Sequence, residues 1–164
     1  MTREQLEAVL SQSLPALYKQ QAQFILTKTV DGSYESREIP EETGTLLNIE
    51  VLQRGEGGNM MELEITTTHG IYKIRKEYNI RQALKPVNYS SGKAIELSLK
   101  DGSIRENFPL LPSAFAYIDF QRDTDGNIVE LSIHGGGYGH GVGMSQWGAY
   151  AMAQQNKNAR QIVS

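Results

Sequence analysis

The sequence of 164 residues contains no cysteine. This absence excludes disulfide bonds, cysteine-ligated zinc and a thiol nucleophile. An excess of basic side chains is also missing, because 16 Lys and Arg stand against 19 Asp and Glu, which gives a formal charge of −3. Sequence-independent binding of nucleic acid depends on a strongly positive surface, so a DNA or RNA partner is disfavoured.

Long apolar runs are absent as well. No run approaches the roughly 20 residues that a membrane-spanning helix needs. Residues 1–10 carry Glu4 and Glu7 where a secretion signal would be basic and then apolar. We therefore expect no membrane segment and no export signal in this chain. Its length and its 39% hydrophobic side chains fit one domain over residues 1–164.

Local patterns divide the chain into a helix plus a hairpin over residues 1–45 and a β-rich core over residues 46–164. Thr2 and Gln5 form a capping-box pattern before a helix over residues 3–14, and Pro15 is expected to mark its end or the start of a second short turn. Turn signals and alternation predict a fold of class α+β, mainly antiparallel β-sheet with flanking helices. We expect strands over residues 24–30, 33–39, 46–52, 60–67, 71–75, 94–99, 117–121 and 128–133, and helical turns over residues 79–84.

A glycine-rich segment follows the last predicted strand. Seven of the 16 glycines fall between positions 135 and 148, and good helix formers occupy residues 149–155. The chain is therefore expected to close with a strand, a glycine-rich loop and a helix. Glycine lets the backbone adopt positive φ or approach another surface closely, so residues 134–148 are the candidate site.

This segment also concentrates side chains that can do chemistry: His134, Tyr138, His140, Ser145 and Gln146. His140 stands between two glycines without apolar neighbours that would bury it, which favours a functional role. Ser145 can also be interpreted as the N-cap of the closing helix. Trp147 and Tyr150, three residues apart on that helix, are interpreted as core anchors.

Several familiar site motifs do not fit. The dinucleotide pattern G-x-G-x-x-G and the P-loop pattern are absent. The serine-hydrolase pattern G-x-S-x-G is broken by Trp147, which leaves a Ser145 nucleophile as a minor alternative. H-E-x-x-H is missing too, so zinc at His134 and His140 would need His69 or a carboxylate as a third ligand. We expect no cofactor and no metal, with zinc as the weaker alternative.

The segment HGGGYGHGVGMSQWGAYAMA at residues 134–153 closely resembles the signature of the SpoIID/LytB domain, the stage II sporulation protein D family. Residues 49–54 (IEVLQR), 79–84 (NIRQAL) and 112–115 (PSAF) resemble the same family in the same order. The resemblance covers residues 46–164 well and the first predicted helix more weakly. It suggests the C-terminal portion of such a domain.

Members of this family are lytic transglycosylases that cleave the MurNAc-GlcNAc bond of peptidoglycan during engulfment of the forespore, and LytB-type relatives enhance amidases. The resemblance implies peptidoglycan glycan strands and other cell-wall hydrolases as partners, and a location outside the cytoplasmic membrane. It implies supporting catalytic roles for His134, His140, Ser145 and Gln146, and substrate-binding roles for Tyr138, Arg81, Gly139 and Gly141.

The sequence departs from the family at the general acid. The catalytic glutamate of the family lies in a helix of the pattern A-A-E-M-P, which nothing in residues 1–48 resembles. Other carboxylates have no motif around them, and alternating charged residues are typical of a solvated strand face; they are Glu62, Glu64, Glu77, Asp119 and Glu130. We therefore expect a fragment that does not cleave glycan by itself. The alternatives are a non-catalytic cell-wall-binding or amidase-enhancer module and a purely structural glycine loop, although packing alone does not require two imidazoles.

Overall fold

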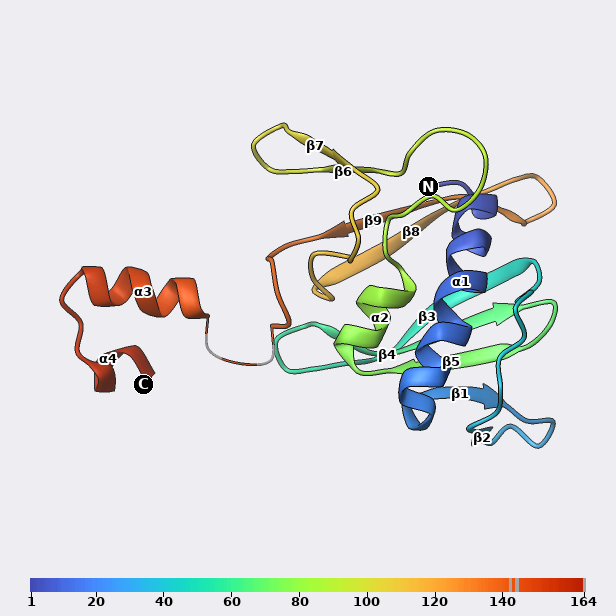
Figure 1. Cartoon of the computed structure of the whole chain (residues 1–164), viewed down its shortest axis with the longest axis horizontal. Helices are drawn as coiled ribbons and strands as arrows, with labels where there is room; N and C mark the ends of the chain where they lie inside the picture. The colour runs from blue at the N-terminus through green and yellow to red at the C-terminus, as the bar shows by residue number, and fades with distance from the viewer. Residues whose placement is uncertain (142, 144, 164) are drawn as a thin grey trace.

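The computed structural model describes residues 1–141, 143 and 145–163. Figure 1 shows a five-stranded sheet of order β2-β1-β5-β4-β3 and two small sheets, β6-β7 and β8-β9. All the strand pairs within these sheets are antiparallel. The strands are β1 (Ile25–Lys28), β2 (Tyr34–Glu35), β3 (Leu46–Arg54), β4 (Met60–Thr67), β5 (Ile71–Arg75), β6 (Glu96–Ser98), β7 (Ile104–Glu106), β8 (Ala116–Arg122) and β9 (Ile128–Gly135). The predicted α+β class is confirmed.

The first helix, α1 (Arg3–Gln21), is longer than predicted. Its capping box is present, because the Thr2 hydroxyl accepts from the Gln5 backbone and the Gln5 side chain accepts from the Thr2 backbone. The predicted end at Pro15 is wrong, since the helix continues for six more residues. Pro15 and Leu17 are both buried, so packing of this face offsets the backbone hydrogen bond that proline removes. Among the residues that the structure describes, no helix is both long and apolar enough to cross a membrane.

One hydrophobic core joins the two predicted parts of the chain. In Figure 1, α1 lies across the five-stranded sheet. Strand β1 comes from residues 1–45 and pairs with β5, with Ile25 opposite Ile74. The N-terminal amine also donates to Leu131 O at 2.8 Å, which ties α1 to β9. The fully buried core side chains include Leu6, Leu10, Leu14, Ile25, Leu63, Ile65, Ile74 and Ile80.

The hairpins fall where turn residues predicted them. Strands β3 and β4 pair from Leu46 with Thr67 to Arg54 with Met60, and β8 and β9 pair from Ala116 with Gly135 onward. Helix α2 (Glu77–Ala83) begins two residues before the predicted position. The predicted strand over residues 94–99 is confirmed only at its centre, by β6, and its partner β7 was not predicted.

The closing helices α3 (Gln146–Gln154) and α4 (Ala159–Val163) lie apart from the sheets (Figure 1). Helix α3 buries no residue, and Trp147 and Tyr150 are 81% and 58% exposed. The interpretation of these two rings as core anchors is therefore wrong. Their rings meet edge to face with centroids 6.1 Å apart, on a helix that lies apart from the sheets (Figure 1).

Candidate functional site

The glycine loop, defined here as residues 135–141, is attached to the body by hydrogen bonds along its length. Gly136 N donates to Phe115 O at 3.0 Å, and Gly139 N donates to Pro112 O at 2.9 Å. The side-chain amide of Asn59, in the turn between β3 and β4, donates to Gly141 O at 3.1 Å. The loop is thus a pinned backbone that crosses the end of the β8-β9 hairpin and reaches the β3-β4 turn.

Two glycines of the loop are required by close contacts. A Cβ on Gly135 would lie 2.7 Å from Phe115 O, and one on Gly141 would lie 2.4 Å from Asn59 Nδ2. Gly141 also has φ +66°, a left-handed conformation that favours glycine. The predicted use of positive φ and of close approach is therefore confirmed at this loop.

His134 is the next-to-last residue of β9 and faces solvent. Its ring stacks on Tyr117 of β8, with centroids 4.9 Å apart and planes inclined by 17°. Asp119 lies on the same face, with Oδ2 3.7 Å from His134 Nε2. Because Tyr117 and His134 both remain about half exposed, they present a flat ring surface with a carboxylate beside it.

His140 lies on the loop between Gly139 and Gly141 and is exposed. Its charge acts on the carboxyl of Glu77, the first residue of α2. Burial raises the pKa of Glu77, and the charges of Arg81 and His140 partly oppose that rise. The charge of the imidazole therefore reaches a carboxyl group that is nearly buried.

Arg81 is buried and not open to solvent. Its Nε donates to Leu111 O at 2.8 Å, and Leu111 N donates back to Arg81 O at 3.2 Å. Its Nη1 lies 3.6 Å from Glu77 Oε2. The guanidinium thus ties α2 to the segment of Leu111 and Pro112, to which Gly139 of the glycine loop is hydrogen-bonded, and a substrate-binding role for Arg81 stays a prediction.

A groove of about 480 Å³ runs beside the glycine loop on the β6 side. Its lining residues are Leu97, Ser98, Leu99, Lys100, Leu111, Pro112, Ser113, Ala116, Ile133, Gly135, Gly136, Gly137 and Tyr138. The three glycines expose backbone to this groove, since they carry no side chain. Tyr138 is exposed at its border and meets Phe108 edge to face at 6.4 Å.

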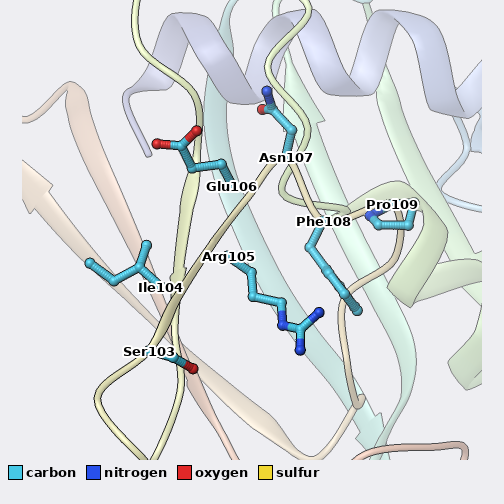
Figure 2. Close-up of a pocket in the computed structure, with 7 residues that line it drawn as sticks. All are labelled: Ser103, Ile104, Arg105, Glu106, Asn107, Phe108 and Pro109. Carbon is cyan, nitrogen blue, oxygen red and sulfur yellow. The ribbon is translucent and has the colours of Figure 1, made fainter.

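A second, open hollow of about 470 Å³ follows residues 103–109 (Figure 2). In this view Arg105 and Phe108 extend to one side of the segment, while Glu106 and Asn107 extend to the other. Asn107 Oδ1 accepts from the backbone of Asn88 and Ile95, so this side chain holds the segment in place. Phe108 links this hollow to the groove through Tyr138.

Ser145 caps α3 as the sequence indicated. Its hydroxyl accepts from Gly148 N at 3.0 Å. Gln146 is the first residue of α3 and is exposed. Val142 and Met144 lie outside the described residues. The structure thus gathers Tyr138, Gly139, His140 and Gly141 on the loop and His134 at its base, and it sets Ser145 and Gln146 at the start of a helix that stands away from the sheets.

Sequence reasoning missed three neighbours of the predicted site: Asn59, Tyr117 and Phe108. Asn59 directly follows the glycine-rich turn of residues 55–58, and Tyr117 alternates with buried positions in its strand. Neither position in the sequence indicates which residue Asn59 or Tyr117 will contact. The contact of Asn59 spans 82 positions in sequence, so only the folded chain reveals it.

Within residues 1–141, 143 and 145–163, no three His, Asp or Glu side chains cluster in a way that could hold a metal ion. His69 Nδ1 lies 3.0 Å from Glu42 O, at the end of β4 opposite to Asn59. The structure therefore does not bring His69 to the two histidines of the loop region.

Comparisons with known proteins give a partial similarity. A family described as a domain of unknown function, DUF8618, matches residues 17–96. An uncharacterized protein of Brachyspira hyodysenteriae is 38% identical over 77 residues, which cover 44% of this chain and 20% of that protein. Stage II sporulation protein D of Bacillus amyloliquefaciens is 40% identical over 65 residues, which cover 40% of this chain and 17% of that protein. These alignments thus span about a fifth of the curated relatives. No solved structure matches the chain. The chain therefore has distant, partial similarity to stage II sporulation protein D.

Proposed function

We propose that this chain recognises peptidoglycan glycan strands, as one domain of a protein that acts outside the cytoplasmic membrane. The observation that carries the proposal is the half-exposed stack of His134 on Tyr117 at the base of the glycine loop. A flat ring surface with Asp119 beside it suits a ligand with both apolar and hydroxyl faces. The partial similarity to stage II sporulation protein D supports the same ligand class.

The finer proposal is that the whole protein is a lytic transglycosylase that cleaves MurNAc-GlcNAc bonds. In such a reaction one carboxyl group protonates the glycosidic oxygen and then accepts a proton as the 6-hydroxyl of the sugar closes an anhydro ring. We assign supporting roles in orienting the glycan to His134, His140, Ser145 and Gln146, and binding roles to Tyr138, Arg81, Gly139 and Gly141. We assign no acid in this chain, since Asp119 is exposed and Glu77 is nearly buried.

Retention on insoluble glycan tests the proposal. We expect the purified chain to sediment with peptidoglycan from which stem peptides have been removed, and the double variant His134→Ala/His140→Ala to stay largely in solution. Circular dichroism and thermal unfolding serve as controls, because both histidines are exposed and their loss is expected to leave the fold intact. Equal retention of the variant, or no retention of the parent chain, would refute glycan recognition by this loop.

Analysis of the soluble products separates binding from cleavage. We expect no anhydromuropeptides and no shortened strands after incubation with the chain, because no general acid is assigned in it. Release of either product would show that a carboxylate of this chain acts as the acid. His140→Ala in the full-length protein is expected to abolish cleavage and to leave thermal stability nearly unchanged.

A second candidate function is that of an amidase enhancer, and the exposed aromatic face of α3 favours it. Trp147 and Tyr150 are large aromatic side chains exposed to solvent, as expected of a surface that binds a protein partner. Adding the chain to a purified cell-wall amidase tests this candidate. Stimulation that Trp147→Ala abolishes, without retention on glycan, would favour the enhancer over the glycan-recognition domain.

A further inference from the structure

Segments far apart in the sequence converge beside the glycine loop. Lys76 N donates to Met61 O at 2.9 Å, and Met60 N donates to Ala114 O at 2.9 Å. These bonds set the start of β4 beside the start of α2 and beside the segment that holds Gly139. Figure 1 shows the chain beyond β9 passing the β3-β4 turn near α2. The glycine loop therefore lies over a junction of three other segments.

Asn59 lies in this junction, and only one end of its buried side-chain amide is hydrogen-bonded among the described residues. It is 5% exposed, and its Nδ2 donates to Gly141 O, while its Oδ1 is buried without a hydrogen-bond partner in the described part of the chain. A buried amide oxygen without a partner is unfavourable. Because this side chain is not optimal for stability, we attribute its place to the shape that it imposes on residues 139–141.

Glu77 also has a buried side-chain oxygen without a hydrogen-bond partner among the described residues. Its side chain is 12% exposed, and its Oε2 has no hydrogen-bond partner among the described residues. A buried carboxylate is unfavourable unless it is well paired, and its ion pair with Arg81 is loose, because the 3.6 Å separation from Nη1 is longer than a hydrogen bond. The residue before it, Lys76, adopts φ +75°, which is rare for a residue with a side chain. Two unfavourable features thus coincide beside the loop.

Arg81 and His140 are the charged groups that act on the Glu77 carboxyl. Burial is the largest effect and raises the pKa of Glu77, and the charges of Arg81 and, more weakly, of His140 lower it. Residues 111–114 contribute no charged side chain, and the β3-β4 turn contributes Glu56. The imidazole and the carboxyl group therefore interact across the junction.

We propose that Asn59 and Glu77 are positioning residues for His140: Asn59 holds the backbone after the imidazole through Gly141, and Glu77, paired with Arg81, holds the segment of Leu111 and Pro112 to which Gly139 is hydrogen-bonded. The arrangement links α2, through Arg81 and Leu111, to both sides of His140. It does not depend on the ligand of the loop, and it gives a role to two polar side chains that stability alone does not favour.

Titration of the Glu77 carboxyl tests whether His140 acts on Glu77 across this arrangement, as their shared attachment to the loop requires. In protein labelled with ¹³C at glutamate carboxyls, we expect the pKa of Glu77 to rise further in His140→Ala, because the imidazolium that lowers it is removed. His134→Ala is the matched control and is expected to leave this titration unchanged. A merely structural role for Glu77 would not make its titration depend on His140. The same curve in His140→Ala and in the parent chain would overturn the positioning role of Glu77.

Amide hydrogen exchange at Gly139 tests how the loop backbone is held. This amide donates to Pro112 O, so its exchange rate reports on the backbone beside His140. We expect Asn59→Ala and Glu77→Gln each to accelerate it about threefold or more, by local opening. Glu62→Gln is the control, since Glu62 pairs with Lys73 and Arg75 on the open face of the sheet. Unchanged exchange in both variants would overturn the proposal.

The two measurements also separate this inference from the proposed function. If Glu77→Gln fails to fold, the titration in His140→Ala still decides, because His140 is exposed and its loss is expected to be tolerated. A Glu77 titration that responds to His140, together with no retention on glycan, would refute glycan recognition and leave the positioning roles intact. Retention on glycan, with a Glu77 titration that does not respond to His140→Ala, would support glycan recognition and refute the positioning roles.

Discussion

Asn59 and Gly141 occupy complementary space, although 82 positions separate them in sequence. The Asn59 amide donates to Gly141 O at 3.1 Å, and it also fills the volume that a side chain at position 141 would need. The placement of the loop thus depends on an amide at one position and on a missing side chain at the other.

Gly141→Ala is expected to destabilise the fold by about 1–3 kcal/mol, because φ at this position is positive and the new Cβ would meet the buried Asn59 side chain. Denaturant unfolding measures this change. Gly143→Ala is the matched control: its Cβ would make an ordinary contact at 3.5 Å with His140, and we expect a change within about 0.5 kcal/mol. Equal effects of the two substitutions would contradict the close fit of Asn59 and Gly141.

Tyr117→Ala is expected to weaken retention on glycan strands about threefold to tenfold, because it removes the ring on which His134 stacks. The melting temperature should change little, since Tyr117 is more than half exposed. Tyr117→Phe keeps the ring and should retain binding. Tyr89→Ala, another exposed tyrosine outside the site, is the control. Full retention by Tyr117→Ala would exclude the stack from the binding surface.

Ser145→Ala is expected to fray the first turn of α3, with a loss of about 1 kcal/mol in helix stability, since Gly148 N loses its acceptor. Ser145→Asp should preserve the helix, because a carboxylate caps equally well. Exchange of the Gly148 amide checks both variants. If Ser145→Asp retains the helix and also retains function in the full-length protein, the hydroxyl has no chemical role beyond capping.

The Asp31 carboxyl in the β1-β2 turn is expected to titrate near pH 2. Hydrogen bonds from the Thr29 hydroxyl and then from the Ser33 backbone and hydroxyl lower its pKa from 3.8 to about 2. Because the folded-state value lies below the unfolded one, the contribution to stability is present above about pH 4 and is lost as the pH falls to about 2. Carboxyl ¹³C titration measures it, and Thr29→Ala should move the midpoint upward. An unchanged midpoint in that variant would contradict the assigned cause.

Hairpins were predicted well because their signals are local. Asp31-Gly32 and the glycine-rich turn of residues 55–58 end strands by backbone preference, which acts between neighbours in sequence. The end of α1 was predicted wrongly because the same local reasoning gave Pro15 too much weight. Burial of Leu17 against the core outweighs it, and burial depends on elements distant in sequence.

The sequence by itself determined which side chains are available: a glycine-rich segment with two imidazoles, and the signature that resembles the stage II sporulation protein D family. Strand register and packing decided their neighbours, placing Tyr117 against His134 and Asn59 against Gly141, the residue after His140. They also left Trp147 and Tyr150 uncovered. The physical reason is that backbone conformation follows from adjacent residues, whereas the surroundings of a side chain are set by contacts between segments that meet only when the whole chain folds.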